Sequence, residues 1–221
     1  LNCAQVAADQ ITAAGGQASC IQADVSKVED VRRLMDAAVA NFGSVDILVN
    51  NAGLQYVSPI HEYPEEKWNQ LIGVMLTGTF LCTKYALPHM MARKWGRIIN
   101  IGSIHSKIAS AFKPAYVAAK FGISGFTRVT ALEAAAYGIT ANCICPSYVR
   151  TPLVQRQVDG LAETHHIPAS EVEQKIMLAD AAVKRLLEPT EVADLVLYLC
   201  SESAGGITGS DVVIDCGWTA H

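Results

Sequence analysis

The chain has 221 residues, of which 51% are hydrophobic and 17% are charged, and this length allows one sizeable buried core. Its formal net charge of −4, with Lys and Arg scattered among Asp and Glu, argues against binding to nucleic acid or to an anionic membrane surface. No apolar run reaches the roughly 18–20 residues needed to cross a bilayer, and no basic segment followed by an apolar one marks a secretory signal. We expect a cytoplasmic protein of one domain, with neither a nucleic-acid nor a membrane partner.

The seven cysteines are odd in number and most lie in apolar segments, which favours reduced, buried thiols over a disulfide framework. Cys143 and Cys145 would share one face of a strand, but no second Cys or His pair follows at ligand spacing. His165 and His166 likewise have no third ligand near them in the sequence. We therefore predict no metal site.

Helical and strand-like patterns alternate along the chain. Ser26 is placed to cap the second helix and Gly43 to end it, and Pro114 suits the first turn of a later helix. The run 45–53 is apolar and ends in a turn, as is typical of a strand covered on both faces. The predicted helices are 2–14, 27–42, 65–93, 114–137 and 189–202, and the predicted strands lie within 17–26, 45–53, 96–103, 138–147 and 209–217.

This alternation predicts an α/β fold, with a parallel sheet and helices on both of its faces, in one domain over 1–221. Residues 150–188 are polar, helical in places and without a strand pattern, so we expect them to form a lid over a site. Ligands of such sheets bind outside the carboxyl ends of the strands. Residues 51–53, Ser103 and residues 146–147 all fall at strand ends, so these candidates converge on one edge.

Ser103, Tyr116 and Lys120 form the clearest chemical pattern. Tyr116 and Lys120 are i and i+4 on one helix, and a tyrosine with a reference pKa near 10 needs a nearby positive charge to act as a base at neutral pH. Ser103 is placed to hold an alcohol or carbonyl oxygen against the tyrosine. The trio suits proton transfer at an alcohol oxygen paired with hydride loss from its carbon, although Tyr and Lys at this spacing also occur by chance in many helices.

The motif S-x12-Y-x3-K formed by these residues, with "NNAG" at 50–53 and "CPSYVRTPL" at 145–153, resembles the short-chain dehydrogenase/reductase family over essentially the whole chain. The resemblance implies a Rossmann-type doubly wound fold, usually a homotetramer, that uses NAD or NADP to oxidise alcohols or reduce ketones. It makes Tyr116 the acid/base, Lys120 the residue that lowers its pKa and holds the nicotinamide ribose, and Ser103 the residue that polarises the substrate oxygen. The implied cofactor contacts are Asp24 and Val25 at the adenine, Asn51, Ala52 and Gly53 at the ribose and diphosphate, and Pro146, Ser147, Val149 and Thr151 at the nicotinamide, with Tyr116 and Lys120.

Within the family, stretches such as "NNAGLQYVSPI" and "KPAYVAAKFGISGFTRV" are most similar to the bacterial 3-hydroxybutyrate dehydrogenases. Those enzymes hold a small carboxylate, and a lysine with amide and imidazole donors supplies charge-assisted hydrogen bonds to such a group. The resemblance thus predicts NAD as cofactor and a short hydroxy acid as substrate. Taken singly, His105 and Lys113 are also consistent with an ordinary loop histidine and a solvated cation. The implied substrate contacts are Gln55, Ser103, His105, Lys113, Tyr116, Gln157 and Trp218.

The family's glycine-rich turn after the first strand, which carries the cofactor diphosphate, has no counterpart in these 221 residues. In the strand order 3-2-1-4-5-6, loss of the first β-α-β segment would orphan the strand near 18–23 and leave "VDILVNN" as an unpaired apolar edge. We expect a longer polypeptide or a cofactor site that is not intact, and we favour the first. The position that selects NAD or NADP would be lost with that segment or altered around Asn2 and Cys3.

Two further positions depart from the family pattern. Met75 stands where the family usually has an asparagine that holds a water in the proton path, and methionine cannot donate a hydrogen bond. From its surroundings in the sequence, Met75 is expected to pack in the core or between helices. Ser147 replaces a glycine that is common after the proline, a milder change near the nicotinamide.

Two hypotheses therefore stand beside an NAD-dependent dehydrogenase of a short 3-hydroxy acid. One is a dehydrogenase of the same fold that acts on another alcohol or on a 3-oxoacyl compound. The other is a non-catalytic member of the family that has lost the glycine-rich turn and keeps only the fold.

Overall fold

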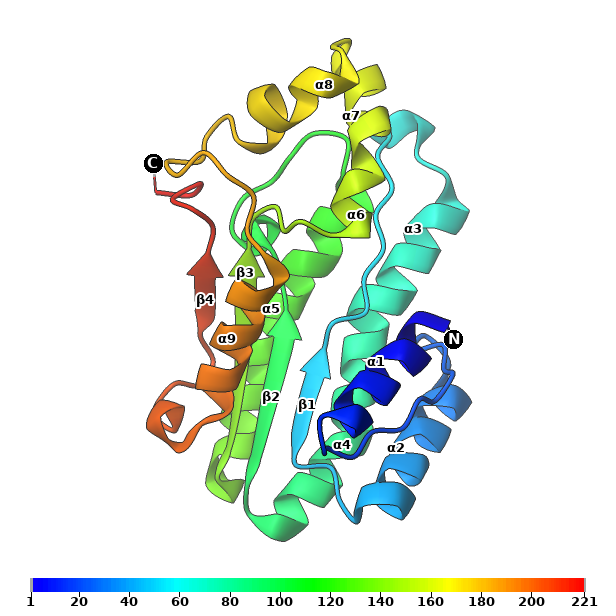
Figure 1. Ribbon diagram of the computed structural model, residues 1–221, viewed down its shortest axis with the longest axis vertical. Helices are drawn as coiled ribbons and strands as arrows, with labels where there is room; N and C mark the ends of the chain where they lie inside the picture. The colour runs from blue at the N-terminus through cyan, green and yellow to red at the C-terminus, as the bar shows by residue number, and fades with distance from the viewer. Residues whose placement is uncertain (1, 221) are drawn as a thin grey trace.

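A parallel sheet forms the centre of the protein (Figure 1). The computed structural model describes residues 2–220, apart from the side chains of residues 2, 3 and 164. The sheet has four strands in the spatial order β1-β2-β3-β4, and each neighbouring pair is parallel. These strands are β1 (Ile47–Asn50), β2 (Gly96–Ile101), β3 (Ile139–Pro146) and β4 (Asp211–Ile214).

Helices cover both faces of the sheet, which confirms the expected Rossmann-type α/β architecture. The long helices α4 and α5 pack on one face, and α9 packs on the other, at the front in Figure 1. The helices are α1 (Asn2–Ala13), α2 (Val28–Phe42), α3 (Glu65–Ile72), α4 (Gly78–Arg93), α5 (Pro114–Ala134), α6 (Pro152–Gln155), α7 (Gln157–His165), α8 (Ala169–Val172) and α9 (Pro189–Cys200).

The two central strands are apolar because both of their faces are covered. Ile98 and Ile99 in β2 and Ile144 in β3 are completely buried, and they point alternately to the α4/α5 side and to the α9 side. The chain direction puts the carboxyl ends of β1, β2 and β3 at one edge of the sheet. The residues that follow these strands are thereby brought together.

The helix predicted for 65–93 is continuous but not uniform, because a π-helical turn (Gly73–Thr77) joins α3 to α4. Contrary to the expectation drawn from apolar runs, Glu65–Arg93 is long and apolar enough to cross a membrane by length and composition, the one such helix in the described part of the chain. Its inner side, with Leu71, Met75 and Met90, is buried against α5 and the sheet, which accounts for its apolar character.

Two local predictions are wrong. No strand forms within 17–26, because this stretch has no strand beside it to pair with, and it runs as irregular chain to the start of α2. Ser26 does not cap α2, since its hydroxyl donates to the Asp24 carboxylate and the N-cap position is Lys27. Gly43 ends α2 in the left-handed conformation, as predicted.

β1 is an edge strand within the described residues, as the sequence predicted. It pairs with β2 alone, and the side chains of Ile47 and Val49 are 45% and 42% exposed. A strand edge with exposed branched apolar side chains is a site where another strand can pair.

The segment 150–188 forms a small layer of short helices at the carboxyl edge of the sheet, at the top of Figure 1. We call residues 150–188 the lid. The lid has its own buried apolar cluster, against which Trp218 and Tyr148 pack. The members of the cluster are Val154, Leu161, Val172, Met177, Leu178, Ala181 and Leu186.

Gly138 makes the turn from α5 into β3 and gives a stability prediction. Its φ is +71°, and a Cβ there would lie 2.6 Å from the backbone oxygen of Lys94. We expect Gly138→Ala to lower the free energy of unfolding by about 1–3 kcal/mol in urea denaturation. Gly206→Ala is the control, because its φ is not positive and no atom lies within 4 Å of the added methyl. Equal stabilities for the two variants would contradict this account.

Candidate active site

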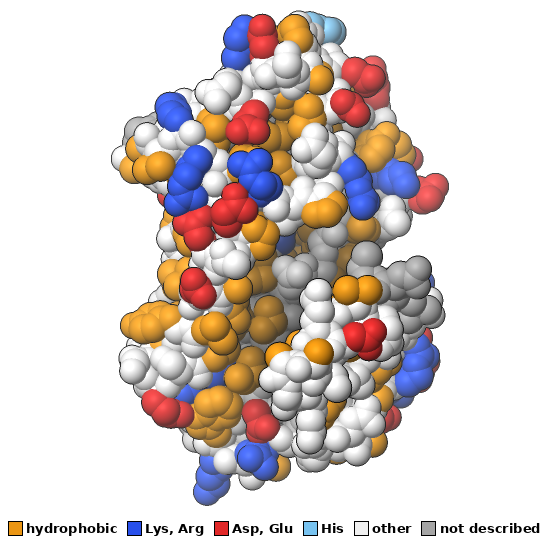
Figure 2. Space-filling model, in the orientation of Figure 1, with side chains coloured by type: hydrophobic (Ala, Val, Ile, Leu, Met, Phe, Trp, Pro, Cys, Tyr) orange, Lys and Arg blue, Asp and Glu red, His pale blue; other side chains and the backbone are white. Residues whose placement is uncertain are grey.

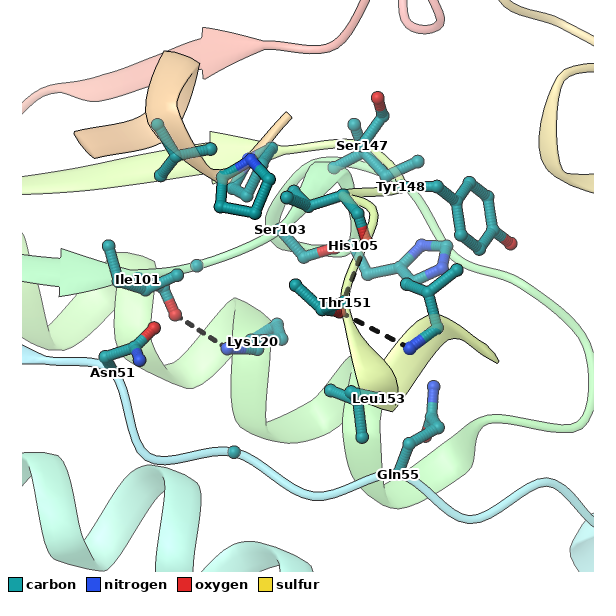
Figure 3. Close-up of a pocket in the computed structure, with 18 of the residues that line it drawn as sticks. Asn51, Gln55, Ile101, Ser103, His105, Lys120, Ser147, Tyr148, Thr151 and Leu153 are labelled. Atoms are coloured by element: carbon teal, nitrogen blue, oxygen red, sulfur yellow. Dashed lines mark hydrogen bonds between the residues drawn. The ribbon is translucent and has the colours of Figure 1, made fainter. Parts of the chain in front are cut away.

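A cavity of about 630 Å³ lies at the carboxyl ends of β1, β2 and β3, below the lid. Figure 2 shows that the face seen in Figure 1 is hollowed at its centre, below the lid helices, with hydrophobic side chains gathered around α9. The cavity brings together most of the residues predicted from the sequence, some of which are drawn in Figure 3. These are Asn51, Gly53, Gln55, Ser103, His105, Lys113, Tyr116, Lys120, Pro146, Ser147, Val149, Thr151 and Gln157.

Local structure fixes the position of Ser103 and of the helix that carries Tyr116 and Lys120. Ser103 follows β2 with extended backbone and begins a short 3-10 turn, in which its backbone N–H donates to the Ser106 hydroxyl. Pro114 occupies the first turn of α5, where its missing N–H costs nothing. Tyr116 therefore lies in the first turn of a rigid helix, and Lys120 follows it one turn later.

Lys120 is buried, with 5% of its surface exposed, and its ammonium donates to the backbone oxygen of Ile101 at 2.6 Å. Burial lowers the pKa of this lysine to about 8, because the charged form loses its hydration. The ammonium also lies 5.4 Å from the centroid of the Tyr116 ring. The predicted proximity of Tyr116 and Lys120 on one helix face is thus found in the structure.

Tyr116 is partly buried at the cavity wall, and its ring meets His105 edge to face at 5.9 Å between centroids. Burial raises the pKa of the Tyr116 hydroxyl, and a hydrogen bond with the Ser103 hydroxyl acts in the opposite direction. In this arrangement the hydroxyl is protonated near neutral pH. The lowering of the Tyr116 pKa that was expected from Lys120 is therefore not the dominant effect. The lysine ammonium instead donates to the Ile101 carbonyl.

Lys113 is the second buried cation of the cavity, with 3% of its surface exposed. Burial lowers its pKa to about 8, and its ammonium donates to the Tyr148 hydroxyl at 3.2 Å. Among the described residues, no Asp or Glu lies within ion-pair distance of Lys113, and none lines the cavity. An unpaired buried ammonium is costly, and a bound anion would relieve that cost.

His105 lies beside this lysine as a neutral ring. Burial, followed by the charge of Lys113, lowers the pKa of His105 to about 3. Its Nε2 lies 3.4 Å from the Ser110 hydroxyl. At neutral pH the imidazole can therefore take part in hydrogen bonds, while the positive charge of this end of the cavity belongs to the lysine.

Four predicted residues lie outside the cavity. Asp24 lies in the loop before α2 and accepts from Ser26, and Val25 packs against α4 at Gly78. Ala52 is exposed in the turn after β1. Trp218 packs in the apolar cluster of the lid and donates from Nε1 to the backbone oxygen of Met177, so the structure gives it a supporting position behind the cavity wall.

Sequence reasoning placed Tyr148 only within the segment 146–151 expected at the nicotinamide, and it assigned no role to the α9 residues that line the cavity. Tyr148 lies within the quoted stretch "CPSYVRTPL", so its position was available, but its contact with Lys113 spans 35 residues and has no sequence signal. The sequence predicted only that α9 would pack on one face of the sheet. The α9 residues that line the cavity are Pro189, Val192, Ala193, Val196 and Leu197.

Cys143 and Cys145 share one face of β3, as predicted, with 3.8 Å between their sulfur atoms. The Asp211 carboxylate is close enough that the three groups have ligating atoms within 4.8 Å of one another. That carboxylate already accepts from Ser124 and forms ion pairs with two cations, Lys107 and Arg128. Its charge is therefore balanced by the protein itself.

Comparisons with known proteins bear on the chemistry of this cavity. A family model described as enoyl-(acyl carrier protein) reductase matches residues 2–219. The D-beta-hydroxybutyrate dehydrogenases of Cupriavidus necator and Rhizobium meliloti are each 46% identical over 199 residues, 90% of this chain and 77% of the relative. The cis-4-hydroxycyclohexanecarboxylate dehydrogenase of Sinomonas cyclohexanicum is 38% identical over 208 residues, 94% of this chain and 79% of the relative.

The chain belongs to the short-chain dehydrogenase/reductase family. The resemblance inferred from the motifs is thus confirmed, and the protein is an oxidoreductase of this family. The Met75 side chain, at the position where the family usually has asparagine, is completely buried between α3, α5 and β3. It lies in the π-helical turn, and its backbone oxygen accepts from the Thr79 hydroxyl at 2.6 Å. Met75 therefore packs in the core, as expected.

Short-chain dehydrogenases/reductases use a nicotinamide dinucleotide, and the cavity fits the nicotinamide and ribose half of that cofactor. Asn51, Tyr116 and Lys120 line the cavity together with Ser147 and Thr151 from the segment after β3, and Figure 3 shows Ser147 on the side away from Asn51. Among residues 2–220 no glycine-rich turn follows a strand to receive the diphosphate. The side chains of Asn2 and Cys3, near which the NAD-or-NADP position is predicted, lie outside the described residues.

The buried charge of Lys113 predicts how stability depends on pH. The pKa of Lys113 is about 8 in the folded protein, against 10.5 for an unperturbed lysine in the unfolded chain. The cost of burying the charged lysine therefore lowers the stability of the fold fully below pH 8. This cost disappears between pH 8 and 10.5. We expect Lys113→Met to raise the free energy of unfolding at pH 7 by on the order of 2 kcal/mol, with a gain that shrinks toward pH 10.5. Urea denaturation across this pH range measures the effect, and a less stable variant at pH 7 would contradict it.

Proposed function

We propose that the protein interconverts (R)-3-hydroxybutyrate and acetoacetate, with NAD as the hydride acceptor and NADH as the donor. The observation that carries this proposal is the unpaired ammonium of Lys113 in a cavity that also contains Ser103, Tyr116 and Lys120. The trio supports alcohol–ketone chemistry, and the separate cation supports an acid as the substrate.

Tyr116 is proposed to move the proton. In the direction of oxidation the tyrosinate form of Tyr116 takes the proton from the substrate hydroxyl at Oη. In the direction of reduction the protonated form, which burial favours, gives its proton to the carbonyl oxygen. The Ser103 hydroxyl, which hydrogen-bonds with Tyr116, donates to the same substrate oxygen and stabilises the charge that develops on it. A nicotinamide held beside Ser147 and Thr151 would accept the hydride from the substrate carbon in oxidation and return it in reduction.

Lys120 is proposed to act on Tyr116 through its charge. Its ammonium lies 5.4 Å from the tyrosine ring centroid and is held by the Ile101 carbonyl, so the position of the charge is fixed before the substrate binds. A positive charge at this distance favours tyrosinate over the neutral phenol. The hydrogen bond with Ser103 acts in the same direction, against the pKa increase that burial imposes on Tyr116.

Lys113 is proposed to hold the substrate carboxylate. It is the N-cap residue of α5 and makes no capping hydrogen bond, although Ser, Thr, Asp or Asn is strongly preferred at this position. A cation is also disfavoured at a helix N-terminus, whereas an anion is favoured there. These structural costs support a functional role for the lysine, and the electrostatic cost is relieved when a carboxylate binds the ammonium.

The relatives support a hydroxy acid and also define the competing candidate. Two of them are named D-beta-hydroxybutyrate dehydrogenase, and a more distant one is named for cis-4-hydroxycyclohexanecarboxylate, which is also a hydroxy acid. A carboxylate bound by Lys113 is consistent with either substrate. The higher identity of the first two leads us to choose the acyclic acid.

Lys113→Ala tests the carboxylate site. We expect this variant to raise the KM for (R)-3-hydroxybutyrate at least about tenfold, since a hydrogen bond to a charged group contributes roughly 1.5–3 kcal/mol, with a smaller change in kcat. NADH fluorescence at pH 7.5 measures both constants, and the same assay with NADP tests the cofactor.

Lys107→Ala is the matched control, because Lys107 belongs to the same loop but pairs with Asp211 outside the cavity. An unchanged KM in Lys113→Ala would refute a carboxylate site at Lys113. No turnover of (R)-3-hydroxybutyrate by the wild-type protein, together with turnover of the cyclic acid, would refute the choice of substrate.

We also propose a cytoplasmic homotetramer. Exposed apolar side chains on the outer faces of α4 and α5 support burial against partner chains, including Phe80, Phe121, Val129 and Leu132, of which the last is 82% exposed. Light scattering during size-exclusion chromatography should give four times the mass of one chain. Leu132→Glu should lower that mass, and a monomeric wild-type protein would refute the proposal.

A further inference from the structure

Tyr148 stands between the cavity and the lid, and two parts of the lid fix its position. The backbone oxygen of Tyr148 accepts from the backbone N–H of Leu187 at 2.9 Å, and the next residue, Val149, bridges to the same leucine. The Tyr148 ring packs against the apolar cluster of the lid, which also contains Trp218. Its hydroxyl is therefore held in place by the backbone and by packing of the ring.

The hydroxyl of Tyr148 is the one hydrogen-bond acceptor that the Lys113 ammonium has among the described residues, at 3.2 Å. The ammonium also lies 5.3 Å from the centroid of the Tyr148 ring. Lysine is a donor only, so the tyrosine oxygen must accept in this pair, and the phenolic hydrogen stays available for another acceptor. Lys113 and Tyr148 thus present donors from two different elements to one end of the cavity.

The ends of the cavity differ in the chemistry that they offer. In Figure 3 the labelled side chains of Asn51 and Lys120 lie toward one end, and those of Tyr148, His105 and Gln55 lie toward the other. Burial raises the pKa of Tyr148 to about 12, so its hydroxyl remains a donor over the working pH range. The end with Tyr148 therefore holds one cation and neutral polar groups, with no acidic side chain among its described residues.

We propose that the Tyr148 hydroxyl donates a second hydrogen bond to the carboxylate that Lys113 binds, so that this tyrosine is a substrate-specificity residue. The inference rests on the proposed function, because it requires an acid in the cavity. The hydrogen bond to Tyr148 keeps the Lys113 ammonium inside the cavity, and with the acid bound the two residues would hold the carboxylate between them. Two donors fix the orientation of the acid as well as its charge.

Tyr148→Phe removes only the hydroxyl and keeps the ring that packs against the lid. We expect the KM for (R)-3-hydroxybutyrate to rise about tenfold, with kcat within about twofold, because the lost hydrogen bond goes to a charged group. The KM for the neutral 3-hydroxybutyramide should not change. The variant should also shift the alkaline limb of kcat/KM to lower pH, since the ammonium of Lys113 loses the acceptor that favours its charged form.

Tyr85→Phe is the matched control. The Tyr85 hydroxyl accepts from Arg32 Nε at 3.1 Å, and the guanidinium lies 5.3 Å from the ring centroid, so this pair copies the geometry of Lys113 and Tyr148 outside the cavity. Its kinetic constants should equal those of the wild type.

Three results would overturn the inference. They are an unchanged KM for the acid in Tyr148→Phe, an equal increase in KM for the acid and the amide, and a loss confined to kcat. The last two would indicate a packing role.

Lys113→Ala separates the two proposals. If that variant keeps the wild-type KM, the proposed carboxylate site itself fails, whereas a raised KM in Lys113→Ala with an unchanged KM in Tyr148→Phe rejects the role of Tyr148 alone. A thermal melt of each variant confirms folding.

Discussion

The free energy of holding two lysine ammonium groups away from water is the constraint on which the site depends. Lys113 and Lys120 are both buried, and each has one neutral oxygen as its acceptor, from Tyr148 and Ile101 respectively. Burial lowers the pKa of each lysine, because the charged form loses its hydration. The sheet and α5 tolerate it because a closely packed apolar core lies below the cavity and stabilises the fold elsewhere.

The two lysines divide the cavity into two functions. Lys120 lies on α5 one turn beyond Tyr116, where we propose that its charge acts on the proton-transfer group. Lys113 lies at the start of the same helix, where we propose that its charge holds the anion. One helix therefore carries both lysines, while the lid, through Tyr148, fixes where the Lys113 ammonium lies.

The sequence predicted those features that depend on spacing within one element. Tyr116 and Lys120 meet because i and i+4 share a helix face, and Ser103 reaches them because a parallel sheet brings its strand ends to one edge. The contact of Lys113 with Tyr148 and the position of Trp218 depend on how the lid folds back, which no local pattern encodes. The strand expected within 17–26 does not form, because a strand needs a neighbouring strand to pair with as well as a suitable sequence.

If Lys113 holds a carboxylate as proposed, its burial would also link the lifetime of the folded protein to that ligand. A small carboxylate that binds the ammonium removes an electrostatic penalty and adds the binding free energy itself, and ligands that bind only the folded state shift unfolding by mass action. Proteolysis and aggregation act on the unfolded chain, so the amount of protein kept in a cell would follow the supply of the acid. The same lysine would then set how long the protein persists as well as what it binds.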